Sequence, residues 1–298
     1  MKKSITIRDT FAEAFPMKAS RLIITAHTKK WALEAANSFT GFATSVIACG
    51  CEAGIEKTLD GKSTPDGRPG ASILIFSMSQ KELAKQILNR AGQCIMTSPT
   101  SALFAGNFSD KKINLGKSLR YFGDGYQISK ILGGKRYWRI PVMDGEFICE
   151  DFAFQMKGIG GGNFLILGDK IENVISAAER AVKKMNKLKN IILPFPGGIV
   201  RSGSKVGSKY KNLIASTNFE YCPTLKGFTK SRLDKKINCV LEIVIDGINK
   251  KDIEMAMKEG ILEIINSRLT KGVTKISAYE NQAASNSKAE NFRKLILA

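Results

Sequence analysis

The chain has 298 residues, 43% of them apolar, and a formal net charge of +19. This length allows one large domain or two smaller ones with a full hydrophobic core. No apolar run approaches the roughly 20 residues that a membrane-spanning helix needs. The first ten residues enter strand-like alternation rather than a signal-peptide core, so we expect a cytoplasmic protein with no membrane partner.

The positive charge has two explanations. One is an anionic partner, whether nucleic acid, membrane or a polycarboxylate substrate. The simpler one is a solvated, lysine-rich surface, which the even scatter of the lysines favours. The sequence has no run of five basic residues and no aromatic-basic interleaving of the kind found in RNA-binding sheets, so we expect no nucleic-acid partner.

Cysteine and histidine usage argues against a metal site. The six cysteines are scattered, and a chain of this size needs no disulfides, so we expect reduced thiols. Only Cys49 and Cys51 are close together, and neither the other cysteines nor His27 supplies a second ligand pair for zinc. A single histidine also disfavours catalysis by an imidazole base.

Hydrophobic periodicity predicts the same order of elements in both halves of the chain. The expected strands are residues 20–26, 44–49, 71–78 and 93–98, then 163–168, 190–195, 239–247 and 273–278. The expected helices begin near Lys29, Ser79, Glu172 and Asn249, and Ser79 and Glu82 have the spacing of a capping box. This α+β pattern predicts two ferredoxin-like (β-α-β-β-α-β) lobes, residues 1–148 with a β-hairpin arm and residues 149–298.

Two long insertions interrupt these units. Residues 119–147 contain Gly-Asp-Gly, Gly-Gly and Asp-Gly turns between β-rich runs, which predict hairpins. The second insertion is residues 194–238. Loops this long in a compact protein are usually functional, and a contact between subunits is the alternative.

The second insertion begins with PFPGGIVRSGSKVGSKYK, which has the composition of a phosphate-binding loop. Gly198 and Gly203 have the spacing of the P-loop glycines, but serine stands where the P-loop lysine must be, and no amphipathic helix follows. We therefore exclude a nucleotide hydrolase. The remaining possibilities are an exposed connector or a loop that binds the carboxylate or phosphate groups of a substrate tail through Ser204, Lys205, Ser208 and Lys209.

Glu242 stands out in the strand CVLEIVIDG. Alternation places Leu241, Ile243 and Ile245 on one face and Glu242 on the other, between two valines. The commoner arrangement is a carboxyl that is solvated on an open sheet face. The alternative is a partly desolvated carboxyl, whose raised pKa suits a general acid.

Two further polar residues lie in turn-rich segments. Arg68 follows Asp-Gly in TPDGRPG and is either an anion contact or a loop charge. Asp124 in FGDGYQ is either a turn residue or a polar site residue, and the turn is the simpler interpretation. Residues 216–223, STNFEYCP, form a polar loop, for which a structural role is a simpler interpretation than a chemical one.

In order along the chain, several segments resemble the formylmethanofuran:tetrahydromethanopterin formyltransferase family. They are DTFAEAFPMKASRLIITA, TGFATSVIACGCEAGIE, TPDGRPG, FGDGYQISK, GGKRYWRIPVMDGEF, PFPGGIVRSGSKVGSKYK, ASTN and EIVIDG. The resemblance covers residues 9 to about 278 without large gaps and is nearest to the bacterial branch, the formyltransferase subunit of formyltransferase/hydrolase complexes.

The resemblance implies two ferredoxin-like lobes, substrates bound at subunit contacts, and a homo-oligomer, a tetramer in this family. It implies transfer of a formyl group between the amine of methanofuran and N5 of tetrahydromethanopterin in one-carbon metabolism, with both carriers as co-substrates and no permanently bound cofactor or metal. In the bacterial pathway the formyl group passes from 5-formyl-tetrahydromethanopterin to methanofuran, and partner subunits release formate. The alternative is a mainly structural subunit of such a complex.

The resemblance also assigns roles to the ambiguous residues. Glu242 matches the family's proposed acid, which would protonate the departing amine. Both carriers have anionic tails, which suit the lysine- and serine-bearing loop. The substrate-binding residues that we expect are Ser204, Lys205, Ser208, Lys209, Ser216, Thr217, Asn218, Asp124 and Arg68. Two features depart from the family pattern: Phe219 replaces an aspartate, and the chain end after Ala278 lacks a glycine-rich segment.

Overall fold

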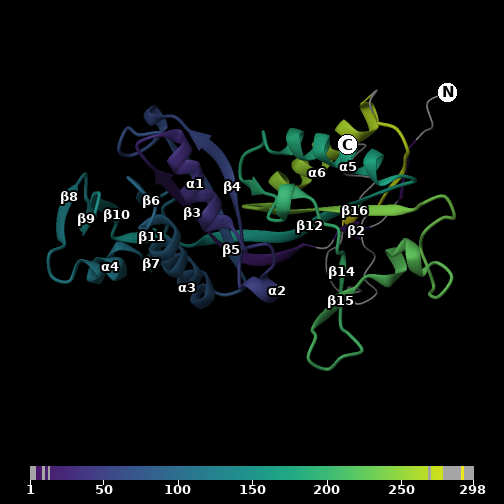
Figure 1. Ribbon diagram of the computed structural model, residues 1–298, viewed down its shortest axis with the longest axis horizontal. Helices are drawn as coiled ribbons and strands as arrows, with labels where there is room; N and C mark the ends of the chain where they lie inside the picture. Colours follow the sequence, from purple (N-terminus) through teal and green to yellow (C-terminus); the bar gives the residue numbers. More distant parts are fainter. Residues whose placement is uncertain (1–4, 9–10, 13, 268–269, 278–289, 292–298) are drawn as a thin grey trace.

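The computed structural model describes residues 5–8, 11–12, 14–267, 270–277 and 290–291. Two lobes lie side by side along the long axis of the molecule, and one mixed sheet of twelve strands runs through both (Figure 1). This arrangement confirms the predicted α+β class with two lobes. Our expectation about the chain end after Ala278 falls on residues that, apart from 290–291, lie outside the described part.

The first lobe is built on an antiparallel set of strands in the order β4-β5-β3-β6. Its two helices share one core with the strands, so both cover the same face of the sheet. Ser79 accepts the backbone N–H of Glu82, which confirms the predicted start of the second helix. The elements are β3 (Phe15–Thr25), α1 (Lys29–Thr40), β4 (Glu52–Leu59), β5 (Gly70–Ser77), α3 (Gln80–Arg90) and β6 (Ala102–Ala105).

The second lobe has the equivalent strand order, β13-β16-β12-β17, again antiparallel and with both helices in one core. Asn249 caps its second helix by accepting the backbone N–H of Asp252. The elements are β12 (Met156–Gly168), α5 (Ile171–Met185), β13 (Ile191–Ile192), β16 (Cys239–Gly247), α6 (Lys250–Asn266) and β17 (Val273–Ser277). Three short strands complete the pairing: β1 (Thr6–Ile7) on β17, and β2 (Phe11–Ala12) with β18 (Glu290–Asn291).

Two predicted strands were wrong. Residues 44–49 contain the short helix α2 (Val46–Cys49), capped by Ser45, and the strand follows it as β4. Hydrophobic periodicity missed β4 because this strand buries two acids, Glu52 and Glu56. Residues 93–98 continue α3 through a π-helical turn, Ala91–Ile95, and the returning strand is the short β6.

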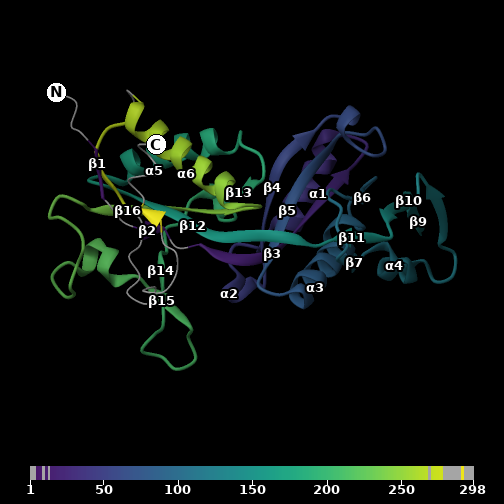
Figure 2. The same ribbon diagram turned by 180° about the vertical axis from the view of Figure 1, so that it is seen from behind.

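The first insertion forms the predicted hairpins at the end of the first lobe away from the second lobe (Figure 2). The turn between β8 and β9 uses Gly133 and Gly134, both in the left-handed region that glycine tolerates best. The elements here are β7 (Lys112–Asn114), α4 (Gly116–Leu119), β8 (Ile128–Leu132), β9 (Lys135–Val142), β10 (Gly145–Glu150) and β11 (Phe152–Phe154).

Strand pairing and side-chain packing both join the lobes. Residues 15–19 of β3 pair with residues 156–160 of β12, which makes the sheet continuous. The edge strands β4 and β13 pack closely, since a Cβ at Gly54 would lie 2.9 Å from the Cβ of Ile192. Beside this contact, Arg21 donates to Glu56 at 2.9 Å and to Asn190 at 2.8 Å. Burial raises the pKa of Glu56, but the Arg21 and Ser72 hydrogen bonds outweigh it and the net pKa is lowered.

All six cysteines are free thiols. Among the described residues, no three histidine, cysteine, aspartate or glutamate side chains gather as metal ligands. No helix in the described part of the chain is long and apolar enough to cross a membrane.

Candidate active site

Glu242 lies in the middle of β16, on the face of the second-lobe sheet that the helices do not cover. Leu241, Ile243 and Ile245 point into the helix-covered core, as alternation predicted. The residue is nevertheless only 6% exposed. The solvated open-face interpretation of Glu242 was therefore wrong.

The second insertion is what buries Glu242. Tyr221, Leu233 and Ile237 of the insertion pack against Leu165 and Leu167 of β12. The insertion also pairs directly with the strand: Val200 and Glu242 exchange backbone hydrogen bonds of 2.8 and 2.9 Å. The segment that the sequence predicted as a long loop thus forms a second layer over the sheet, with Glu242 beneath its edge.

A cavity of about 170 Å³ opens beside Glu242. Asn163 of β12 donates its amide to the Glu242 carboxyl at 2.9 Å and fixes that carboxyl in the sheet. The wall residues that the insertion contributes come from two of its stretches: Val200, Arg201, Ser202, Gly203, Asn218, Tyr221, Cys222, Pro223 and Thr224. A buried carboxyl (Glu242), a neutral amide (Asn218) and an arginine (Arg201) therefore share one small cavity.

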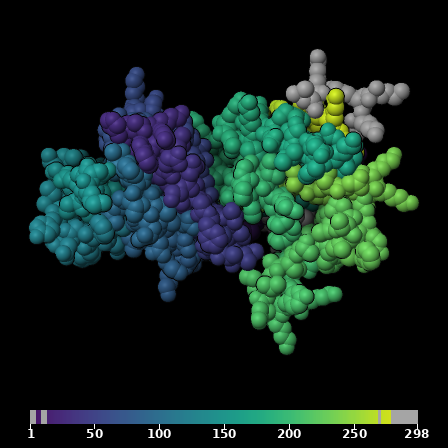
Figure 3. Space-filling model, in the orientation of Figure 1, coloured from purple at the N-terminus to yellow at the C-terminus, as the bar shows by residue number. Residues whose placement is uncertain are grey.

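The predicted substrate loop is a β-hairpin, β14 (Ser204–Val206) paired with β15 (Ala215–Thr217), and it projects as an arm from the second lobe (Figures 1 and 3). Ser204 lies opposite Thr217, and Lys205 opposite Ser216. The Asn218 backbone N–H closes the base of the arm by donating to the Gly203 carbonyl.

Phe219 has a direct contact with this arm. The Lys205 ammonium lies 5.2 Å from the centre of the Phe219 ring, a cation–π contact. This contact holds Lys205 near the base of the arm, where the cavity begins. Ser208 and Lys209 lie farther along, in the turn between the two strands.

The predicted residues Arg68 and Asp124 lie in the first lobe, and within one chain the structure does not bring them to Glu242. Arg68 contacts Asp66 at 2.7 Å, the Thr100 carbonyl at 2.5 Å and Thr25 at 3.1 Å, so it fastens its own loop. Asp124 is exposed and adopts the left-handed conformation of a turn residue, with φ of 49°. The single chain thus groups Glu242, Asn218 and the base of the arm, and leaves these two apart.

Family models identify the site's context. Residues 1–142 match the model described as formylmethanofuran-tetrahydromethanopterin formyltransferase, and residues 145–284 match the model of its proximal lobe. The chain belongs to this formyltransferase family. The candidate cavity therefore lies within the part of the chain that the proximal-lobe model covers.

Formyltransferases of known organisms are similar to this chain over nearly its whole length. The enzyme of Methylococcus capsulatus is 60% identical over 92% of both chains. The matching component of the formyltransferase/hydrolase complex of Methylorubrum extorquens is 51% identical over 86% of this chain and 85% of that protein. In solved structures, the Methylorubrum complex with methylofuran matches with a TM-score of 0.93 at 46% identity, covering 98% of this chain and 97% of that one.

The Methanosarcina barkeri formyltransferase structure matches with a TM-score of 0.90 at 42% identity, covering 98% of both chains. These likenesses confirm the resemblance seen in the sequence motifs. The protein is a formyltransferase of one-carbon metabolism that transfers a formyl group between methanofuran and tetrahydromethanopterin.

Sequence reasoning missed two residues of the formyltransferase site: Asn163, which binds the Glu242 carboxyl, and Arg201, which lines the cavity. Asn163 counted only as the first residue of an apolar strand, although an amide followed by five mainly apolar residues was a signal. Arg201 lies in the same segment as several lysines, so its charge did not stand out in the sequence. The contact of Asn163 with Glu242 joins residues 79 positions apart, which no local pattern reveals.

Proposed function

We propose that Glu242 is the general acid of formyl transfer between methanofuran and N5 of tetrahydromethanopterin. The observation that carries this proposal is a carboxyl only 6% exposed, held by Asn163 and bordering a cavity. A carboxyl withdrawn from water can keep its proton and deliver it to a bound substrate.

The transfer needs only proton movements from the protein. The nitrogen of the accepting carrier attacks the formyl carbon, and the carbonyl oxygen becomes an oxyanion. The bond from carbon to the departing nitrogen then breaks, and Glu242 gives that nitrogen its proton. The attacking nitrogen loses one proton, which restores Glu242, so atoms and charge balance without an oxidant or reductant. The absence of a resident cofactor or metal stays a prediction.

The base of the arm is the proposed contact for an anionic carrier tail. Lys205 is positioned there, and Ser204, Ser216, Thr217 and Asn218 offer hydroxyl and amide groups on the same hairpin. Arg201 lines the Glu242 cavity itself and adds a second cation. Bidentate arginine and nearby lysine are the side chains that suit carboxylate and phosphate groups.

We propose a homo-oligomer, a tetramer as in the family resemblance, with the arm in a subunit contact. The arm supports this because Val206, Tyr210 and Ile214 are all more than half exposed. Exposed apolar clusters of this kind mark association surfaces. In such an assembly Arg68 and Asp124 of one subunit would complete the site of another.

Several finer expectations remain proposals. The strand orders of the two lobes support ferredoxin-like folds, divided at residues 148 and 149. The Methylorubrum structure, a formyltransferase/hydrolase complex, supports hydrolase subunits as partners that release formate after transfer toward methanofuran. The cytoplasmic location stays a prediction.

The decisive experiment measures formyl exchange between the two carriers with the isolated chain and its Glu242→Gln variant. We expect activity in the isolated chain, which would contradict a purely structural subunit. Glu242→Gln keeps the shape of the side chain but removes the acid, so kcat should fall by roughly 10²- to 10⁴-fold. Glu179→Gln, on the exposed face of α5, should leave kcat unchanged. An active Glu242→Gln variant would remove the proposed role.

A further inference from the structure

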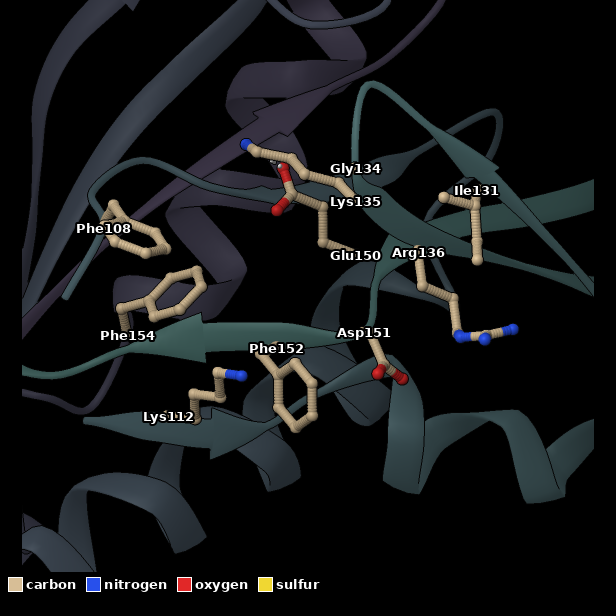
Figure 4. Close-up of a pocket in the computed structure, with 10 residues that line it drawn as sticks. All are labelled: Phe108, Lys112, Ile131, Gly134, Lys135, Arg136, Glu150, Asp151, Phe152 and Phe154. Atoms are coloured by element: carbon tan, nitrogen blue, oxygen red, sulfur yellow. Dashed lines mark hydrogen bonds and ion pairs between the residues drawn. The ribbon is translucent and has the colours of Figure 1, made fainter. Parts of the chain in front are cut away.

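A second cavity lies at the opposite end of the molecule from the Glu242 cavity. It has a volume of about 310 Å³ and lies between the β8–β9 hairpin and the ribbon of β7 and β11 (Figure 4). Ligand pockets in proteins begin at about 300 Å³. Formyl transfer as derived above uses none of the residues around it.

One side of this cavity is aromatic. Phe108 and Phe154 lie side by side with their ring centres 5.0 Å apart, and Phe152 lies on the adjacent side (Figure 4). Phe154 is buried, whereas Phe108 is 79% exposed. A phenylalanine left in water at a cavity mouth, already packed against a second ring, presents a surface for a further flat ring.

The acids around the cavity already have partners. Glu150 is buried and pairs with Lys135 at 3.3 Å across the cavity wall (Figure 4). Burial raises the pKa of Glu150, and Lys135 opposes that rise. Asp151 accepts the Trp138 indole N–H at 2.6 Å. Lys135 thus offsets the charge of Glu150, whereas Asp151 keeps one negative charge because the indole N–H is neutral.

Three cations near the cavity have no carboxylate within 4 Å in the described part of the chain. The ammonium groups of Lys112 and Lys117 both lie over the Phe152 ring, 5.0 and 5.7 Å from its centre. Arg136 donates to the Ser129 hydroxyl. Two lysines that share one aromatic ring leave a local excess of positive charge beside an aromatic wall.

We propose that this cavity binds a small planar aromatic carboxylate. The ring of the ligand packs against Phe108 and Phe154, and its carboxylate meets the ammonium of Lys112. Lys117, whose ammonium lies 5.7 Å from the centre of the Phe152 ring, strengthens the positive potential. Within one chain the site is separate from Glu242 and the arm, which lie in the other lobe.

The test uses saturation-transfer NMR on the full chain with three probes of similar size. Benzoate carries both the ring and the charge, benzamide lacks the charge, and cyclohexanecarboxylate lacks the flat ring. We expect benzoate to bind and each of the other two to bind roughly tenfold more weakly, about 1.4 kcal/mol. If benzoate at about 10 mM does not bind, its affinity is weaker than about 3 kcal/mol and the proposal is overturned.

Variants locate the binding. Lys112→Ala and Phe108→Ala, both at solvent-accessible positions, should each weaken benzoate binding at least roughly fivefold. Lys130→Ala, an exposed lysine on β8 outside the cavity lining, is the matched control and should bind benzoate like the wild type. Glu242→Gln should also bind benzoate normally. Unchanged binding in both cavity variants, or equal binding of cyclohexanecarboxylate, contradicts the proposal.

Discussion

The carboxyl groups of Glu52 and Asp246 lie close together across the junction of the two lobes. Asp246 is fully buried and Glu52 nearly so. Glu52 accepts the backbone N–H of Val46 at 3.1 Å, and Asp246 accepts that of Gly161 at 3.3 Å. The described residues offer no N–H or O–H to the other two oxygens. Two buried carboxylates this close repel each other when both are charged, so we expect the pair to hold a shared proton.

This pair makes stability depend on pH. Burial raises the pKa of both groups, and for Asp246 the Glu52 charge raises it further. An acid whose pKa is raised by folding binds more protons in the folded state than in the unfolded state. Its contribution to the free energy of unfolding is therefore complete below the pKa of the unfolded state, and it is lost as the pH rises through the pKa of the folded state. The free energy of unfolding should therefore fall by up to about 1.4 kcal/mol per pH unit for each proton in that window.

Urea unfolding at several pH values from about 5 to about 9 tests this dependence. Asp246→Asn removes one titrating group and supplies an N–H to Glu52, so its stability should vary less with pH than that of the wild type. Glu34→Gln, an exposed acid on α1, should keep the wild-type slope. Parallel pH profiles for the wild type and Asp246→Asn would mean that the pair holds no proton.

Asn163 should act on catalysis as a positioning residue for Glu242. Its amide donates to the Glu242 carboxyl at 2.9 Å and fixes that carboxyl in the sheet. Asn163→Leu removes that donor, so kcat should fall roughly tenfold because the acid is less well oriented, while KM for each carrier stays close to the wild-type value. A raised KM with an unchanged kcat would contradict the positioning role, and the melting temperature of the variant separates misfolding from either result.

The arm predicts a difference between its two lysines. Lys205 lies at the base, held over Phe219, whereas Lys209 is exposed in the turn. Lys205→Ala should raise KM for one carrier by roughly three- to tenfold, since losing one charge-assisted contact costs on the order of 1 kcal/mol. Lys209→Ala should have a smaller effect, and Lys183→Ala on α5 none. Steady-state kinetics with each carrier varied separately measure these KM values. If all variants have the wild-type KM for both carriers, the arm does not contact a substrate.

Gly160 is a test of packing at the lobe junction. A Cβ there would lie 2.2 Å from the Met17 sulfur and 3.1 Å from an Asp246 carboxylate oxygen. Gly160→Ala should therefore destabilise the protein by about 1–3 kcal/mol through overpacking. Gly227→Ala, where a Cβ would meet no atom within 4 Å, is the control and should change stability little. Thermal melting of both variants measures the difference, and equal melting temperatures would contradict the tight junction.

The sequence predicted the lobes well because their strands and helices follow regular apolar periodicity, as in β16 and α5. It failed at β4, where the burial of Glu52 and Glu56 breaks the apolar pattern. Those acids are buried because partners from other segments meet them: Arg21 for one and Asp246 for the other. Contacts between distant segments cannot be read from local composition.

The candidate site divides in the same way. The family motifs pointed to Glu242 and to the residues of the arm, and the structure brings Glu242 together with Asn218. Local patterns could not reveal that the insertion folds back over the sheet, because this depends on Tyr221 and Ile237 meeting Leu165. The burial of Glu242 is a consequence of that tertiary contact rather than of its own strand.

β12 carries a consequence for how this chain could be divided. Its first residues pair with β3 of the first lobe, while its later residues form the centre of the second lobe. A polypeptide cut in the exposed turn at Met143 would leave β3 on one fragment and β12 on the other. Neither fragment would have a complete sheet, because each would carry one of the two strands that pair at the junction. Co-expressed halves should therefore reassemble by strand pairing, which makes this enzyme a natural scaffold for split-protein complementation.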